Sequence, residues 1–559
     1  MFSTFDPVKN PIGFGASDFI ELTIAALLVA LAIAWRPLIE PYGRRFSLKT
    51  RWCMLALAIL PVGLRLVLLA HHQVPTPDIY DEFGHLFVAD TLLHFRLANP
   101  THAMHRFFET FFILQEPTYS SIYPVGQGTM LALGRAISGF PWAGVLLSTS
   151  AFAALCYWML RGWTTPAWAL AGGVLAVMEF GPLNQWMNGY WGGALAAASG
   201  CMVFGALPRL AERVNTRDAL ILGGGLSIHL LTRPYESLFL VFGVVLFFIP
   251  VVTRVIRAVP IVLVAVIPAI GITLLQNKSV TGQWTTLPYQ LSQYQYGVPA
   301  SLSFQPNPVP HRELTPQQEL EYKSQLAFRE SGKETLQSYL LRLEYRVRFY
   351  RFFFLAPLFL AIPAFCFAAV RELRYAWVLL TLLLFSLGIN FFPAFQLHYL
   401  GAVTCLFVLI SVAGLREISR WSPAAARLLL FLCAIHFIFW YGLHLFDEED
   451  FARTMMRYET WDSINHQNPE RRILVNQQLA EIPGQVLVFV RYSPRHIFQD
   501  EWVYNEASID SARIIWARDL GPEENDKLRA LYPGREALLL EPDMKPPRLS
   551  PYEPRLSTP

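Results

Sequence analysis

The feature that most constrains this chain is a series of long apolar runs separated by short charged connections. A helix needs about 20 apolar residues to cross the hydrocarbon core of a bilayer. Only helices and closed barrels satisfy their backbone polar groups there. We therefore predict a mostly α-helical, polytopic transmembrane bundle of about twelve helices. Their predicted ranges are 18–35, 52–71, 141–160, 167–184, 191–208, 217–231, 235–251, 259–276, 350–370, 375–392, 398–415 and 426–445.

The charges of the short connections predict how the bundle is oriented. If the first helix runs from outside to inside, every short connection assigned to the inside carries Arg or Lys, as the positive-inside rule requires. The short outside connections contribute only Arg233. This orientation places three large polar segments outside, namely loop 72–140, loop 277–349 and the tail 446–559. A transporter keeps its polar residues within the bundle, near the midplane of the membrane. Three large polar segments on the outer side therefore favour an enzyme acting at the membrane surface.

Composition excludes several classes of partner and site. Only 16% of the residues are charged and the formal net charge is +3, which gives a nucleic-acid partner no electrostatic support. All six cysteines lie in apolar runs and none forms a CxxC pair. The polar segments therefore have no predicted disulfide framework and no cysteine metal site.

The first outer loop opens with a cluster of carboxylates just beyond a membrane helix. Asp78, Asp81 and Glu82 fall within five residues, followed by His85. In a helix over 78–97, Asp78 and Glu82 share one face, and Asp81 and His85 share another. Carboxylates at a low-dielectric boundary can supply a general base or bind a divalent cation. The alternative is a solvated helix start, where acids are favoured.

The rest of this loop predicts further local structure. In residues 101–115 an apolar stripe formed by Met104, Phe107, Phe108 and Phe111 predicts an interfacial helix. The alternative is an amphipathic helix packed on the protein's own core. Residues 119–134 contain proline and glycine, and we expect an irregular segment there.

The tail changes character and predicts a small, separate α/β unit. Apolar runs at 486–490, 512–516 and 537–540 predict three short strands, and 522–532 predicts a helix. This pattern favours a parallel sheet, without a glycine-rich phosphate loop. We thus divide the chain into a transmembrane domain, 1–445, and an extracytoplasmic domain, 446–559. His496, Asp500 and Glu501 follow the first strand, where a surface loop is favoured over a metal site.

Four short motifs, taken in order, resemble the C-type (GT-C) superfamily of membrane glycosyltransferases. The motifs are Asp81-Glu82 after a membrane helix, Tyr123-Pro124 followed by Leu-Ala-Leu-Gly, Leu230 to Pro234 (LLTRP), and His398-Tyr399 opening a late helix. The resemblance covers roughly 52–445. It favours the protein O-mannosyltransferase and aminoarabinose transferase branch, because loop 277–349 lacks the WWD-type signature of oligosaccharyltransferases. The helix at 18–35 is an addition to the usual pattern.

The resemblance and the chemistry of the implied reaction together predict roles for individual residues. Asp81 would be the catalytic base, and Glu82 an alternate base or, with Asp81, a ligand for Mg²⁺ or Mn²⁺. Arg233 would bind the carrier phosphate, although it also suits a snorkelling anchor. His398 would hydrogen-bond that phosphate, although a lone His near a helix end is more often structural. The remaining predicted substrate-binding residues are Asp78, His85, Tyr123 and Tyr399.

The predicted function is transfer of a sugar from a polyprenyl-phosphate donor to an extracytoplasmic lipid, glycan or protein. The expected location is the bacterial inner membrane, in contact with its lipids. The alternative is a transporter or flippase of lipid-linked glycans, which should carry charges within its helices, and Arg65 and Glu179 are among the few present. A non-catalytic scaffold would leave the acidic cluster without a purpose.

Overall fold

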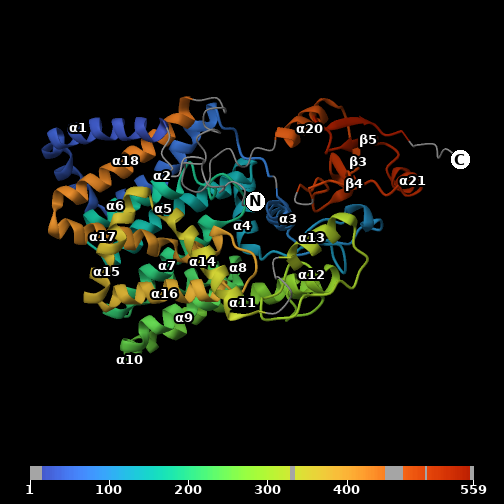
Figure 1. The fold of residues 1–559 in the computed structure, drawn as a ribbon. Coiled ribbons are helices and arrows are strands. Elements are labelled where there is room, and N and C mark those ends of the chain that lie inside the picture. Colours follow the sequence, from blue (N-terminus) through green and yellow to red (C-terminus); the bar gives the residue numbers. More distant parts are fainter. Residues whose placement is uncertain (1–15, 78, 328–333, 447–469, 498–499, 554–559) are drawn as a thin grey trace.

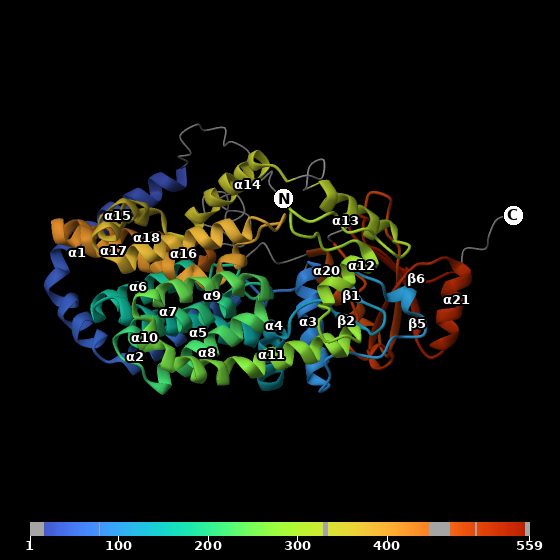
Figure 2. The same ribbon diagram turned by 90° about the horizontal axis from the view of Figure 1, so that it is seen from below.

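The computed structural model describes residues 16–77, 79–327, 334–446, 470–497 and 500–553. The predicted site residue Asp78 lies outside these ranges. The domain boundary predicted at 445–446 lies at the edge of another gap, 447–469. A helical bundle occupies one end of the molecule, a small sheet domain occupies the other, and the two large loops lie between them (Figures 1 and 2).

The bundle contains the predicted apolar runs as helices. Six helical stretches among the described residues are long and apolar enough to span a membrane, with two shorter apolar helices beside them. The chain is thus an integral membrane protein, while the count of about twelve spans stays a prediction. The bundle elements are α1 (Ala16–Ser47), α2 (Thr50–Val67), α5 (Trp142–Trp163), α6 (Pro166–Phe180), α7 (Gly193–Glu212), α8 (Thr216–Thr232), α9 (Pro234–Phe248), α10 (Val252–Val255), α11 (Val259–Thr281), α15 (Ala361–Arg371), α16 (Leu373–Ile389), η8 (Leu397–Val403), α17 (Thr404–Trp421) and α18 (Pro423–Phe446).

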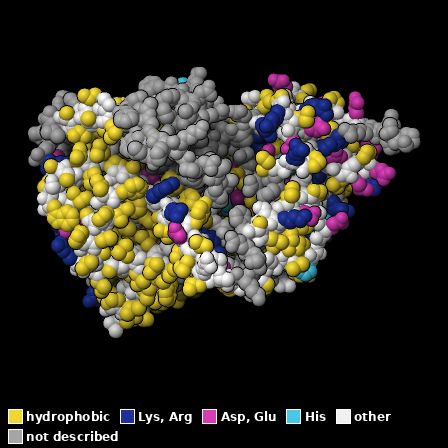
Figure 3. Space-filling view, viewed as in Figure 1, with side chains coloured by type: hydrophobic (Ala, Val, Ile, Leu, Met, Phe, Trp, Pro, Cys, Tyr) yellow, Lys and Arg dark blue, Asp and Glu magenta, His cyan; other side chains and the backbone are white. Residues whose placement is uncertain are grey.

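Exposed apolar side chains cover the bundle, whereas charged side chains gather over the sheet domain (Figure 3). Val264 and Ile267 of α11, for example, are 67% and 61% exposed. An apolar surface of this extent on a soluble protein would drive aggregation. On this protein it is the surface that lipid tails cover.

The single helix predicted over 350–370 is wrong. Helical stretches 336–353 and 356–371 meet there at a bend of 114°. Leu355 is extended, and Pro357 occupies the first turn of the new helix, where its missing N–H costs nothing. The first of the two stretches begins with α14 (Leu336–Arg348).

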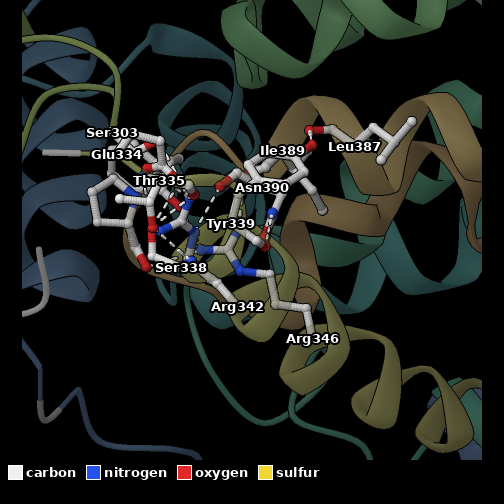
Figure 4. Close-up of polar contacts among 12 residues, drawn as sticks. Ser303, Glu334, Thr335, Ser338, Tyr339, Arg342, Arg346, Leu387, Ile389 and Asn390 are labelled. Carbon is white, nitrogen blue, oxygen red and sulfur yellow. Dashed lines mark hydrogen bonds and ion pairs between the residues drawn. The ribbon is translucent and has the colours of Figure 1, made fainter.

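Helix α14 docks on the end of α16 through the buried Arg346 and the half-buried Arg342 (Figure 4). Arg346 donates hydrogen bonds to the carbonyls of Ile389 and Pro393 at 2.7 and 2.9 Å, and Arg342 Nε donates to Asn390 O at 2.9 Å. Carbonyls at a helix C-terminus carry partial negative charge that attracts cations. These bonds fix the segment that leads from α16 into η8.

The first outer loop corrects two predictions. It contains α3 (Tyr80–Leu93), η3 (His105–Phe108), β1 (Ile113–Leu114), β2 (Ser120–Ser121) and α4 (Val125–Ser138). No interfacial helix covers 101–115, because Phe107 and Phe108 are buried against the tail domain beside Phe489. The end of the segment predicted as irregular is helical, since glycines allow α4 to pack closely on its neighbours. A Cβ on Gly134 would lie 2.2 Å from Gly144 N of α5.

The second outer loop contributes two helices besides α14, namely α12 (Pro288–Tyr296) and α13 (Pro316–Ala327). The tail domain is an α/β unit with α20 (Glu470–Glu481) and α21 (Pro522–Leu531). Its strands are β3 (Val486–Val490), β4 (Ile514–Arg518), β5 (Glu536–Glu541) and β6 (Arg548–Pro551), in the order β4-β3-β5-β6. Strand β3 pairs in parallel with β4 and β5, which confirms the predicted parallel sheet, and β6 adds an antiparallel edge.

The tail domain packs against the outer loops through buried polar contacts. Arg518 pairs with Glu501 at 2.6 Å and donates to Glu109 O of the first loop and to Gln317 Oε1 of α13. Asp90 of α3 accepts a hydrogen bond from Ala507 N at 2.7 Å. The described residues around His496 and Glu501 form a loop, as predicted, but both side chains are buried and not at the surface.

Close packing of α7 against η8 gives a stability prediction. A Cβ on Gly200 would lie 1.8 Å from Ala402 O, so Gly200→Ala forces the two elements apart. We expect the free energy of unfolding to fall by about 1–3 kcal/mol, measured by thermal unfolding in detergent. Gly271→Ala is the matched control, because its Cβ meets no atom within 4 Å. Equal midpoints for the two variants would contradict the packing.

Candidate functional site

Four segments far apart in the sequence meet where the bundle joins the outer loops. They are the first turn of α3, the turn before α4, the α8–α9 junction and the start of η8. Helix α4 packs on both α3 and α8, and η8 packs on α7. The segments carry Asp81, Tyr123, Arg233 and His398 respectively, so the structure brings these predicted residues together.

The carboxyl group of Asp81 lies in this junction, partly buried. The hydroxyl of Tyr123 donates a hydrogen bond to its Oδ1 atom. Burial raises the pKa of Asp81 to about 6, although the Tyr123 hydrogen bond and the Arg233 charge act in the opposite direction. A carboxylate with a pKa near neutrality can accept a proton from a substrate hydroxyl and later release it.

Arg233 supplies the positive charge of the site. It ends α8 and precedes Pro234, the first residue of α9. Its guanidinium carbon lies 5.2 Å from the centre of the Tyr399 ring, and its Nη1 is 4.0 Å from Glu236 Oε1. That distance is long for an ion pair, and the guanidinium keeps donors for an anionic ligand.

Two buried histidines flank the arginine. The ring centres of His85 and Tyr123 lie 4.3 Å apart, and the ring centres of His398 and Trp191 lie 5.3 Å apart. Burial and the Arg233 charge lower the pKa of His85 to about 3, so its imidazole is neutral at physiological pH. Within the described residues, His85 Nδ1, His398 Nδ1 and Trp191 Nε1 are buried without a hydrogen-bond partner. Such atoms can serve a bound ligand.

Glu82 is held by the backbone instead. Its carboxylate accepts hydrogen bonds from Tyr190 N at 2.9 Å and from Ile79 N at 3.4 Å. These hydrogen bonds anchor the start of α3. They do not support Glu82 as an alternate base, and that role stays a prediction. Among the described residues, no group of three or more His, Cys, Asp or Glu side chains could hold a metal ion. Binding of Mg²⁺ or Mn²⁺ by Asp81 and Glu82 therefore stays a prediction.

The structure adds residues that sequence reasoning missed. Tyr80 precedes Asp81 and donates a hydrogen bond to Glu321 of α13 at 3.4 Å. Burial raises the pKa of Tyr289 of α12, and the charge of Asp81 contributes to that shift in a smaller measure. Glu321 carries no local signal in the sequence, because α13 reads as an ordinary charged helix. Only the packing of the second loop on α3 brings it here.

Comparisons with known proteins give a likeness of fold. No protein-family model and no curated protein sequence matches the chain. Among solved structures, ArnT from Cupriavidus metallidurans in the apo state superposes with a TM-score of 0.50 at 11% identity, over 88% of this chain and 93% of that chain. The same protein bound to undecaprenyl phosphate superposes with a TM-score of 0.48 at 10% identity, over 87% of this chain and 92% of that chain. The Archaeoglobus fulgidus oligosaccharyltransferase with Zn and sulfate superposes with a TM-score of 0.40 at 11% identity, over 88% of this chain and 67% of that chain. The chain therefore has the fold seen in the ArnT structure.

Proposed function

We propose that this protein transfers a sugar from a polyprenyl-phosphate donor to an acceptor hydroxyl on the extracytoplasmic face of a bacterial inner membrane. The observation that carries the proposal is the meeting of Asp81 and Arg233 where the apolar bundle ends and the polar loops begin. The phosphate of a polyprenyl carrier lies at that depth, because its hydrocarbon chain stays in the bilayer. Fold alone does not define function, so the residues bear the argument.

The reaction needs a base and a stabilised leaving group. Asp81 takes the proton of the acceptor hydroxyl as its oxygen bonds to the anomeric carbon of the sugar. The bond from that carbon to the carrier phosphate breaks, and the phosphate leaves with the electron pair. Arg233 stabilises the negative charge that develops on the phosphate, since a guanidinium can donate two parallel hydrogen bonds to it.

The surrounding side chains suit these two roles. The Tyr123 hydroxyl donates a hydrogen bond to Asp81 Oδ1. This bond orients the carboxylate and leaves Oδ2 to accept the proton of the acceptor hydroxyl. The Tyr399 ring supports the guanidinium of Arg233. The unpartnered nitrogen atoms of His85, His398 and Trp191 provide further contacts for phosphate or sugar oxygens.

A transporter is less favoured because the buried charge of Arg65 has a structural explanation. Its guanidinium donates to Asn188 Oδ1 at 2.7 Å and to the carbonyls of His72 and Gln73 at 3.0 and 2.9 Å. These bonds hold the end of α2 against the segment after α6. Arg65 therefore stabilises the bundle and offers little to a moving substrate.

The substitution Asp81→Asn tests the base directly. The amide keeps the shape of the side chain but cannot accept the acceptor's proton, so transfer should fall by at least about 100-fold. The assay follows release of the carrier from a panel of polyprenyl-phosphate sugars by the purified protein. Glu319→Gln, an exposed acid paired with Lys323, should leave transfer unchanged. Wild-type activity in the Asp81→Asn protein would refute the assignment.

The pH dependence of transfer gives a second test. Activity should rise through about pH 6 as Asp81 loses its proton. Tyr123→Phe removes a hydrogen bond that favours the carboxylate, so the pKa of Asp81 increases and the acid limb of kcat/KM moves to higher pH. Tyr345→Phe, a change of the same kind on the exposed side of α14, should leave the limb in place. An acid limb that stays put or moves to lower pH in Tyr123→Phe would contradict the contact.

A further inference from the structure

A second carboxyl group lies beside the proposed base. Glu321, on α13 of the second outer loop, is only 3% exposed. Its Oε1 atom accepts hydrogen bonds from the Tyr80 hydroxyl at 3.4 Å and from Gln325 Nε2 at 2.5 Å. Tyr80 is the residue directly before Asp81, so Glu321 approaches the first turn of α3 from outside the bundle.

Among the described residues, no positively charged side chain pairs with Glu321. The groups that act on it are Tyr80 and Asp81 from α3 and Gln325 from its own helix. Among the described residues it forms no ion pair, whereas Asp81 has both the Arg233 charge and the Tyr123 hydrogen bond. Two neighbouring carboxyl groups in a buried place do not ionise together readily. The better-stabilised Asp81 therefore ionises first.

The helix that carries Glu321 is held in place by the tail domain and by the first loop. Arg518 Nη1 donates to Gln317 Oε1 at 3.1 Å, one turn before Glu321. Arg312, which precedes α13, pairs with Glu109 at 2.9 Å. Glu321 thus has a defined position relative to Asp81. Its Oε2 atom makes no hydrogen bond with any residue in the described ranges.

We propose that Glu321 stays protonated beside ionised Asp81 and donates a hydrogen bond from its carboxylic acid to a hydroxyl oxygen of the carbohydrate bound there. The ligand is a carbohydrate hydroxyl, belonging either to the transferred sugar or to the acceptor. This role rests on the proposed glycosyl transfer. The phosphate end is a poor fit for Glu321, because the contacts of Glu321 among the described residues are with Tyr80 and Gln325 and not with Arg233.

The pKa values of the two acids agree with this division of roles. Burial, with a smaller contribution from the charge of Asp81, raises the pKa of Glu321 to about 7, above the value of about 6 for Asp81. Between these values one group is a hydrogen-bond acceptor and the other is a donor. Pairs of acids whose surroundings separate their pKa values divide acid and base roles in this way.

The test compares Glu321→Gln, Glu321→Ala and the exposed control Glu319→Gln in the transfer assay. The glutamine amide still donates a hydrogen bond but does not titrate. We expect Glu321→Gln to keep at least about half of the wild-type kcat/KM at about pH 6.5 and to lack the alkaline fall that wild type shows near pH 7. Glu321→Ala should lose about 10-fold in kcat/KM. An unchanged alkaline limb in Glu321→Gln would overturn the proposal, as would loss of transfer with EDTA that Mg²⁺ or Mn²⁺ restores.

Infrared spectroscopy separates this proposal from the proposed function, because it needs no substrate. The difference spectrum of wild type minus Glu321→Gln at about pH 6 should contain the carbonyl stretch of a neutral carboxylic acid, and the band should vanish by about pH 8.5. The same difference for Glu319→Gln should lack it. Absence of the band refutes a protonated Glu321 even if transfer occurs. A band in a protein that transfers no sugar from any donor refutes the carbohydrate role and the proposed function together.

Discussion

The half-buried charge of Arg233 organises the junction between the bundle and the outer loops. A guanidinium at a helix break, mostly removed from water, is costly unless nearby groups compensate for it. Here Asp81 and Glu236 supply negative charge, and the Tyr399 ring supplies a polarisable face. None of these contacts is a tight ion pair. The compensation is therefore incomplete, and an anionic ligand can complete it.

The tail domain extends this arrangement outward. The single side chain of Arg518 contacts the first loop, the second loop and the buried Glu501 of its own domain. Asp90 ties the end of α3 both to Arg135 of α4 and to Ala507 N of the tail. A domain whose contacts reach both loops limits how far Asp81 and Glu321 can move apart. Its position is thus part of the geometry of the site, although it contributes no residue to the proposed transfer.

Sequence reasoning succeeded where one physical signal was sufficient. The strands at 486–490 and 537–540 were predictable because continuous apolar runs bounded by polar residues suit a buried parallel sheet. Loop charge predicted Asp81 and Arg233 on one side of the membrane, and in the structure Arg233 lies close enough to act on the pKa of Asp81. The stripe at Phe107 and Phe108 was ambiguous, since lipid and a protein core both bury an apolar face. Glu321 was out of reach, because its role depends on a contact with Tyr80, 241 residues away.

The central claim is that Arg233 holds the carrier phosphate while Asp81 faces the sugar. The most direct measurement is an experimental structure of the protein with a non-hydrolysable polyprenyl-phosphate sugar. The account predicts phosphate oxygens within hydrogen-bond distance of the Arg233 guanidinium, the lipid chain along the apolar bundle surface, and the sugar beside Asp81. A carrier phosphate bound away from Arg233, with no sugar near Asp81, would contradict it.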